Sequence, residues 1–275
     1  MSLTIGSTTT LNNGVHMPWL GLGVWKVTAE GDAQRAIHAA LEAGYRSIDT
    51  ARIYNNEAQV GEAIRSSGVS RDEIFVTTKI WNEDQGYERA LAAFEESRKR
   101  LNVGVIDLLL IHWPGTDKFQ ETWRAFEKLY KEGYVRAIGV SNFKVHHLKK
   151  LAEGSDIVPA VNQVECHPLL TQKELLAYAK EHGIQLEAWS PLMQGHLDQP
   201  VLQELAAKYG KSAAQIVLRW DVQSGIVTIP KSITPSRIAE NGAIFDFSLS
   251  DEDMAKIDGL NRDHRFGSDP DKFLF

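Results

Sequence analysis

The chain has 275 residues, of which 43% are hydrophobic, 24% charged and 9% aromatic, so it is too apolar for a disordered chain. With 30 Lys and Arg against 36 Asp and Glu, the net charge is −6, which disfavours a nucleic-acid-binding or anionic-membrane-binding surface. The one cysteine, Cys166, excludes an intramolecular disulfide, and neither an apolar signal core nor an apolar run of bilayer length is present. We therefore expect a cytoplasmic protein without a nucleic-acid or membrane partner.

The first predicted element is an N-terminal β-hairpin. Residues 11–15 place an Asn-Gly turn between apolar residues, which is the pattern of a tight hairpin. Because the hairpin precedes the repeating part of the chain, we expect it to close the floor of the fold that follows.

Short apolar or β-branched runs then alternate with amphipathic stretches, which predicts a series of β/α units. The predicted strands cover residues 19–23, 46–49, 74–79, 107–112, 135–140, 160–164, 185–189 and 226–229. The predicted helices cover residues 33–43, 57–66, 88–101, 119–131, 145–151, 172–182 and 213–223, with an extra C-terminal helix over 250–260 before a polar tail. Eight strands predict one α/β domain over residues 1–275, a closed (β/α)8 TIM barrel, and the main alternative is an open doubly wound sheet.

Local signals support the predicted helix boundaries. Thr171 and Ser212 are each followed three residues later by Glu or Gln, the spacing of a capping box. Four glycines mark helix ends, namely Gly44, Gly68, Gly133 and Gly183.

In a parallel barrel the C-terminal ends of the strands share one rim, where active sites lie. Four residues with titratable side chains, Asp49, Tyr54, Lys79 and His112, follow three consecutive predicted strands. Each alone has a structural interpretation, such as a helix cap, a solvated charge or a packed ring. Their coincidence on one rim favours a catalytic site.

These four side chains suit proton donation to a carbonyl oxygen. Tyrosine has a pKa near 10, and a nearby ammonium such as that of Lys79 lowers it by favouring the phenolate. Asp49 would hold the lysine charged, and His112 would donate a hydrogen bond to a bound carbonyl. The set therefore predicts a general acid for an oxyanion formed by hydride addition.

The alternatives of a metal centre and a cysteine nucleophile are weaker. The chain has no His-Glu-x-x-His motif, and we expect its nine histidines not to cluster with rim carboxylates, with His146 and His147 on a solvated helix face. Cys166 and His167 are neighbours on a strand and should point to opposite faces. We therefore expect no metal ion.

A phosphate site is predicted late in the chain. Lys231 and Ser232 leave the last strand, and Arg237 lies in the first turn of a helix that begins near a proline. A helix N-terminus with two cations suits a phosphomonoester. Neither standard nucleotide-binding fingerprint is present, because Gly21-Leu22-Gly23 lacks a third glycine and Gly210-Lys211-Ser212 lacks the upstream one.

Together these residues resemble the aldo-keto reductase family over essentially the whole chain. Residues 44–57, which contain Asp49 and Tyr54, are similar to the first signature of the family, and residues 229–241 are similar to the last. The overall pattern is similar to bacterial members described as 2,5-diketo-gluconate or methylglyoxal reductases.

The resemblance implies that Asp49, Tyr54, Lys79 and His112 form a catalytic tetrad with Tyr54 as general acid. It implies NADP(H) as cofactor, bound by Gly23, Val24, Trp25, Asp49, Ser141, Asn142, Gln163, Trp189, Ser190, Pro191, Leu192, Lys231, Ser232, Arg237, Glu240 and Asn241. In that set Ser141, Asn142 and Gln163 would hold the nicotinamide carboxamide. Trp189, where most members have Tyr, would stack on the ring. The carbonyl substrate would contact Trp25, Trp81, His112 and Trp113.

The expected function is NADPH-dependent reduction of aldehydes and ketones to alcohols by a monomer. Expected substrates are small dicarbonyls such as methylglyoxal or keto-sugar acids such as 2,5-diketo-gluconate, in a roomy pocket above a short tail. Arg52 either favours acidic substrates at the mouth or points to solvent. The alternatives are a nucleotide-sensing or structural barrel without catalysis, and a metal-dependent barrel hydrolase.

Overall fold

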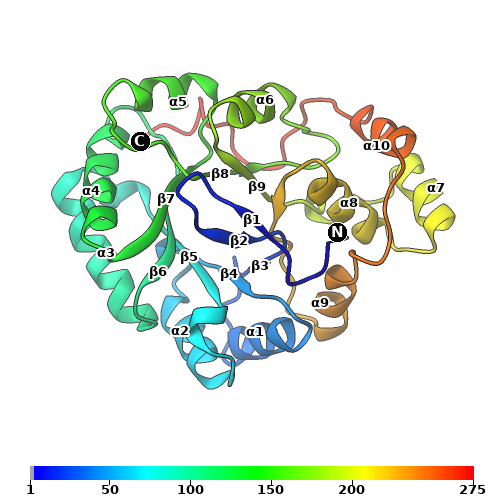
Figure 1. Cartoon of the computed structure of the whole chain (residues 1–275), viewed down its shortest axis with the longest axis horizontal. Helices are drawn as coiled ribbons and strands as arrows, with labels where there is room; N and C mark the ends of the chain where they lie inside the picture. The colour runs from blue at the N-terminus through cyan, green and yellow to red at the C-terminus, as the bar shows by residue number, and fades with distance from the viewer. Residues whose placement is uncertain (1–2) are drawn as a thin grey trace.

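The computed structural model describes residues 3–275, so Met1 and Ser2 of the predicted domain lie outside it. Within these residues, eight parallel strands form one sheet in which each strand pairs with its neighbour in sequence (Figure 1). They are β3 (Leu22–Gly23), β4 (Ser47–Asp49), β5 (Phe75–Ile80), β6 (Ile106–Ile111), β7 (Val135–Ser141), β8 (Val161–Glu165), β9 (Gln185–Trp189) and β10 (Val227–Thr228). Parallel bridges from Leu20 to Thr228 and from Gly23 to Lys231 join the two edge strands, so the sheet closes into the predicted barrel.

Helices surround the barrel on its outside (Figure 1). They are α1 (Asp32–Glu42), α2 (Glu57–Ser66), α3 (Tyr87–Leu101), α4 (Phe119–Lys131), α5 (Val145–Ala152), α6 (Lys173–Glu181), α7 (Pro200–Tyr209), α8 (Ala213–Gln223), α9 (Pro235–Gly242) and α10 (Asp251–Asp258). Short 3-10 turns are η1 (Arg52–Tyr54), η2 (Arg71–Glu73), η3 (Asn82–Asp84) and η4 (Met193–Gly195). The four glycines predicted to end helices all have positive φ, between 68° and 99°.

Two local predictions differ from the structure, and one helix was not predicted. The capping box predicted at Thr171 is wrong, because the helix begins after Gln172, which lies in the left-handed region at φ 56° and makes no side-chain cap. The capping box at Ser212 is present. The strand predicted over 19–23 is shorter in the structure, since only Leu22–Gly23 forms β3. Helix α7 was not predicted at all, although Pro200 at its start and Gly210 after its end are standard boundary residues.

The N-terminal hairpin closes the floor of the barrel, as predicted. It consists of β1 (Thr8–Thr10) and β2 (His16–Pro18), which pair antiparallel around the Asn-Gly turn. Leu11 and Met17 are buried against inward-facing strand residues such as Leu108 in a cluster separate from the main core. In Figure 1 both strands lie across the middle of the barrel. The hairpin therefore leaves the opposite rim for the functional site.

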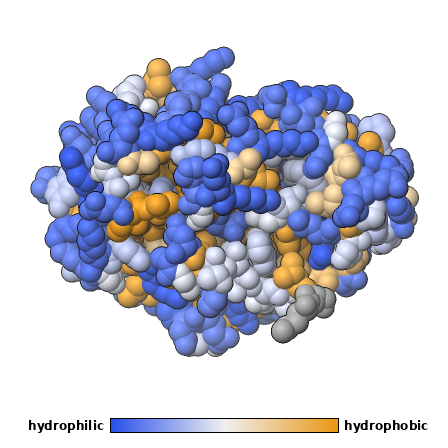
Figure 2. Space-filling model, turned by 45° about the horizontal axis from the view of Figure 1, so that its top comes forward, coloured by the Kyte–Doolittle hydropathy of each residue, from blue (hydrophilic) through white to orange (hydrophobic). Residues whose placement is uncertain are grey.

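The face shown in Figure 2 is mostly hydrophilic, and its apolar residues are scattered among polar ones. Among residues 3–275, no helix is both long and apolar enough to cross a membrane.

Candidate active site

A cavity of about 990 Å³ opens at the C-terminal ends of the strands. Every predicted site residue except Lys79 lines this cavity, from Gly23 at the end of β3 to Asn241 in α9. Lys79 is fully buried at the end of β5 and lies beside the lining residues Asp49 and Tyr54. The parallel register of β4, β5 and β6 places these strand ends side by side, which is why spacing along the sequence predicts the site.

The four tetrad side chains form one contiguous group. The ammonium of Lys79 donates to Oδ1 of Asp49 at 2.5 Å and to the carbonyl oxygen of Thr50 at 2.9 Å. Its nitrogen lies 5.1 Å from the ring centroid of Tyr54. The ring of His112 meets that of Tyr54 edge to face, with centroids 5.8 Å apart. The tyrosine is therefore in contact with both the cation and the imidazole.

The pKa of Tyr54 differs from the sequence prediction. Burial raises this pKa above its ordinary value, and the opposing charge of Lys79 does not outweigh the loss of solvent. The expectation of a lowered pKa is therefore wrong for the protein without ligand. A raised pKa keeps the phenol protonated, which is the form that a general acid needs.

Lys79 and His112 differ in their charge states. Burial alone would lower the pKa of Lys79, but the charge of Asp49 outweighs this effect and raises it. Burial and the nearby Lys79 hold the pKa of His112 well below its ordinary value. At neutral pH the lysine is thus cationic and the histidine neutral, so the imidazole can donate one hydrogen bond without carrying charge.

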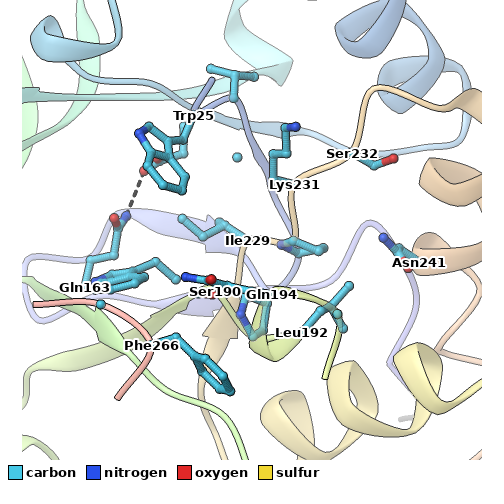
Figure 3. A pocket seen from close by; sticks show the side chains of 18 of the residues that line it. Trp25, Gln163, Ser190, Leu192, Gln194, Ile229, Lys231, Ser232, Asn241 and Phe266 are labelled. Atoms are coloured by element: carbon cyan, nitrogen blue, oxygen red, sulfur yellow. Dashed lines mark hydrogen bonds between the residues drawn. The ribbon is translucent and has the colours of Figure 1, made fainter. Parts of the chain in front are cut away.

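Gln163 links the tetrad to a carboxyl that the sequence analysis missed. Its Nε2 donates to Oδ2 of Asp49 at 2.7 Å, the hydrogen bond drawn in Figure 3, and to Oε2 of Glu187 at 2.8 Å. Glu187 lies two residues before Trp189 on β9, and the two-residue period of a strand was the signal that it faces the barrel interior.

Asn142 fixes the orientation of two neighbours. Its Oδ1 accepts a hydrogen bond from the indole Nε1 of Trp189 at 2.9 Å, and its Nδ2 donates to the carbonyl oxygen of His112 at 2.9 Å. The hydroxyl of Ser141 donates to the carbonyl oxygen of Gln163 at 2.8 Å. These bonds hold the Trp189 ring at the cavity wall in a defined orientation.

The far end of the cavity carries positive charge. Figure 3 shows Lys231, Ser232 and Asn241 grouped on one side of the cavity, away from Gln163. Both side chains are exposed, and within residues 3–275 neither Lys231 nor Arg237 has a carboxylate within 4.0 Å. Arg237 lies in the first turn of α9, which begins at Pro235. Both cations therefore lie near a helix N-terminus and are free to meet an anion.

The C-terminal tail forms one wall of the cavity, which the sequence analysis did not predict. Phe266, Gly267, Ser268 and Phe273 line it, and the ring of Phe273 packs 4.7 Å from that of Trp113. Trp113 is 9% exposed, whereas Trp25 at the mouth is 52% exposed. Phe273 of the tail thus covers one side of the cavity beside Trp113.

Glu165 fastens this tail. Its carboxylate accepts hydrogen bonds from the backbone N–H of Phe266 at 2.7 Å and of Gly267 at 3.0 Å, and it lies 2.9 Å from Nε2 of His167. Burial alone would raise the pKa of Glu165, but these hydrogen bonds outweigh burial and lower it. The tail therefore binds a buried carboxylate two residues beyond Gln163 on β8.

Arg52 does not face the cavity. Its guanidinium pairs with Asp84 at 2.5 Å and with Glu96 at 2.7 Å, and it is absent from the cavity wall. These ion pairs favour the surface interpretation of Arg52 over the attraction of acidic substrates, although the guanidinium is paired and does not point freely to solvent. The arginine instead joins η1, which carries Tyr54, to α3.

The predicted solvated helix face is confirmed for His146, which is exposed, and is wrong for His147, which is buried. Both imidazoles lie near Asp271 of the tail, beside a separate hollow of about 500 Å³, and His147 is 9% exposed. Nδ1 of His147 accepts a hydrogen bond from the backbone N–H of Lys144, so in the neutral ring Nε2 carries the proton. The ammonium of Lys144 already pairs with Asp271 at 2.6 Å. The cluster thus connects α5 to the tail, and it is poorly suited to a metal ion.

Comparison with known proteins places this geometry in a family. The sequence model described as "Aldo/keto reductase family" matches residues 19–262. A protein named glyoxal reductase from Bacillus subtilis is 61% identical over 276 residues, covering 100% of both chains. A protein named methylglyoxal reductase DkgA from Salmonella typhimurium is 50% identical and covers 96% of both. A crystal structure of a Gox0644 mutant in complex with NADPH matches with a TM-score of 0.93 at 41% identity, covering 98% of this chain and 99% of that one.

Proposed function

This chain belongs to the aldo/keto reductase family, and from that premise we propose that it reduces small dicarbonyl compounds to hydroxycarbonyl compounds with NADPH. The observation that carries the proposal is the contiguous group of Asp49, Tyr54, Lys79 and His112 at the base of a cavity. The far end of this cavity carries two cations that have no carboxylate partner among residues 3–275. Relatives named glyoxal and methylglyoxal reductase support the substrate class.

The residues present fit an NADP cofactor. Lys231 and Arg237, which lack carboxylate partners within residues 3–275, would hold the 2′-phosphate together with Ser232, and Glu240 and Asn241 would contact the adenine. Gln163 and the oriented ring of Trp189 would hold the nicotinamide, and Ser190, Pro191 and Leu192 would line the pyrophosphate. When bound, NADPH supplies the hydride that adds to the carbonyl carbon.

In this proposal the chain's own residues hold and move one proton. Neutral His112 donates a hydrogen bond to the carbonyl oxygen and positions it beside Tyr54. The phenol of Tyr54 gives its proton to that oxygen as the carbon is reduced, which yields the alcohol and a phenolate. The buried ammonium of Lys79 stabilises the phenolate, and Asp49 keeps Lys79 oriented. Trp81, Trp113 and Phe273 exclude water from this step.

The substrate end of the cavity suits small neutral carbonyl compounds. Its walls are Trp25, Trp81, Trp113 and Phe273, and the ion-paired Arg52 supplies no cation for an acidic substrate. We therefore rank methylglyoxal and glyoxal above keto-sugar acids such as 2,5-diketo-gluconate.

We further propose that residues 1–275 form a single domain and act as a cytoplasmic monomer. The barrel uses elements from one end of the chain to the other, and the one cysteine, Cys166, is buried and free. The scattered apolar residues on the face in Figure 2 support the monomer.

The test is the loss of NADPH absorbance with methylglyoxal, glyoxal and, separately, 2,5-diketo-gluconate. We expect turnover with NADPH to exceed turnover with NADH. Tyr54→Phe should lower kcat by about 10²–10⁴-fold, the usual contribution of a general acid, and leave the Kd for NADPH within about threefold. Saturable NADPH binding without turnover of any carbonyl substrate would instead favour a nucleotide-sensing barrel.

A further inference from the structure

Glu187 is a buried carboxyl inside the barrel that the proposed reaction does not use. It lies in the middle of β9, next to Gln163 of β8 and Val227 of β10, and is 1% exposed. Its Oε2 accepts the 2.8 Å hydrogen bond from Gln163, and among residues 3–275 its Oε1 has no hydrogen-bond partner. A buried carboxyl with so few partners destabilises the fold, so stability does not explain its presence.

The first consequence of Glu187 concerns the orientation of Gln163. A side-chain amide has two N–H donors and one oxygen acceptor, and here the nitrogen serves both Glu187 and Asp49. If the amide were flipped, its oxygen would face the charge of Asp49, and both carboxyls would lose the N–H donor that they share. Because Gln163 also lines the cavity, the two carboxyls fix its oxygen as the atom available to a donor such as the nicotinamide carboxamide.

The second consequence is electrostatic. A continuous set of contacts leads from Glu187 through Gln163 to Asp49, and from Asp49 through Lys79 to the ring of Tyr54. Asp49 of β4 and Lys79 of β5 are the ionisable groups that act on Glu187, and the charge of Glu187 acts on Tyr54 of η1. Burial, reinforced by the charge of Asp49, raises the pKa of Glu187 to about 8. In turn, an ionised Glu187 raises the pKa of Tyr54. The strand neighbours Gln163 and Val227 carry no charge, whereas the cation Lys79 opposes this effect and lowers the pKa of both Glu187 and Tyr54.

On the basis of the proposed reduction with Tyr54 as proton donor, we propose that Glu187 is a positioning residue of this reaction. It holds the amide of Gln163 with its oxygen toward the nicotinamide, and its negative charge retains the proton on Tyr54 in alkaline solution. Glu187 thereby widens the pH range over which the enzyme reduces carbonyl groups.

Two variants separate the two roles. Glu187→Gln removes the charge and keeps an oxygen acceptor for Gln163, whereas Glu187→Met removes both at similar length. Both should fold, because replacing a buried charged group by a neutral one of similar volume is commonly neutral or stabilising. Asp221→Asn is the matched control: this carboxyl is buried in α8, bonds to Thr228 and lies outside the cavity wall.

The readouts are kcat against pH in both reaction directions and the Kd for NADPH from tryptophan fluorescence. As the pH rises and Tyr54 loses its proton, the kcat of reduction falls and the kcat of alcohol oxidation rises. These two changes are the two limbs of the pH profile. In both Glu187 variants the two limbs should move together to lower pH by about one unit, because the pKa of Tyr54 falls when a nearby negative charge is lost. Only Glu187→Met should weaken NADPH binding, by about 10-fold, since it alone removes the acceptor.

Three results would overturn the proposal. In the first, the limbs do not move in either Glu187 variant. In the second, the limbs move equally in Asp221→Asn. In the third, NADPH binding is unchanged in Glu187→Met. A wild-type enzyme without Tyr54-dependent turnover would be a distinct failure, because it contradicts the proposed function itself and removes the proton transfer that Glu187 is proposed to assist.

Discussion

Arg237 offers a single-residue test of cofactor choice. In the first turn of α9 its guanidinium is exposed and has no carboxylate within 4.0 Å among residues 3–275, so it is free to bind a phosphate. We expect Arg237→Ala to raise the KM for NADPH by about 10–100-fold, the cost of losing charge-assisted hydrogen bonds of about 1.5–3 kcal/mol.

The KM for NADH should change by less than about threefold in the same variant, because NADH lacks the 2′-phosphate. Steady-state kinetics with both cofactors measures the two effects. Arg124→Ala, which removes an exposed arginine from α4, is the control. Equal increases in the KM for NADPH and for NADH would show that Arg237 does not bind the 2′-phosphate.

At the scale of residues, the sequence predicts where a side chain lies better than it predicts the groups that surround it. Asp49, Lys79 and His112 end consecutive strands, so their shared rim follows from the parallel register alone. The pKa of Tyr54 does not follow, because it depends on how far burial opposes the charge of Lys79. Arg52 is a similar case, since its partners Asp84 and Glu96 lie in other elements and sequence spacing does not reveal them.

At the scale of elements, periodic segments were predictable and the tail was not. The structured tail depends on contacts far away in sequence, above all the hydrogen bonds from Phe266 and Gly267 to Glu165. No local pattern encodes such contacts. The tail packs closely against the cavity wall, because a Cβ added at Gly267 would lie 2.4 Å from the ring of Trp189. Helix α7, in contrast, carried recognisable boundary signals at Pro200 and Gly210.

Glu165→Gln should release this tail. Glutamine offers one acceptor oxygen where the carboxylate offers two, so one buried backbone N–H loses its partner at a cost of about 1–3 kcal/mol. We expect faster proteolytic cleavage within residues 262–268 and a higher KM for the carbonyl substrate, whose pocket the tail completes. Glu181→Gln, an exposed substitution at the end of α6, should leave both quantities unchanged. An intact tail in Glu165→Gln under the same protease would show that other contacts hold it.

At the scale of the whole molecule, the hairpin and the proposed active site lie at opposite ends of one barrel. The hairpin packs into the floor through Leu11 and Met17, while the tetrad and the tail occupy the rim. This separation follows from the parallel sheet, in which the C-terminal ends of all strands lie on the same side. A change at the floor should therefore affect unfolding without affecting the reaction.

Met17→Ala tests this separation. Met17 is fully buried, and its truncation leaves a cavity that costs about 2–5 kcal/mol of the free energy of unfolding. For a chain of this size that corresponds to a fall in Tm of about 5–15 °C by differential scanning calorimetry. Val15→Ala, at a half-buried position of the same hairpin, should lower Tm by less than half as much. At 25 °C the kcat and KM of both variants should equal those of the wild type, because among residues 3–275 none of the residues that cluster with Met17 lines the cavity. A lower kcat in folded Met17→Ala would show instead that the floor and the rim are coupled through the barrel.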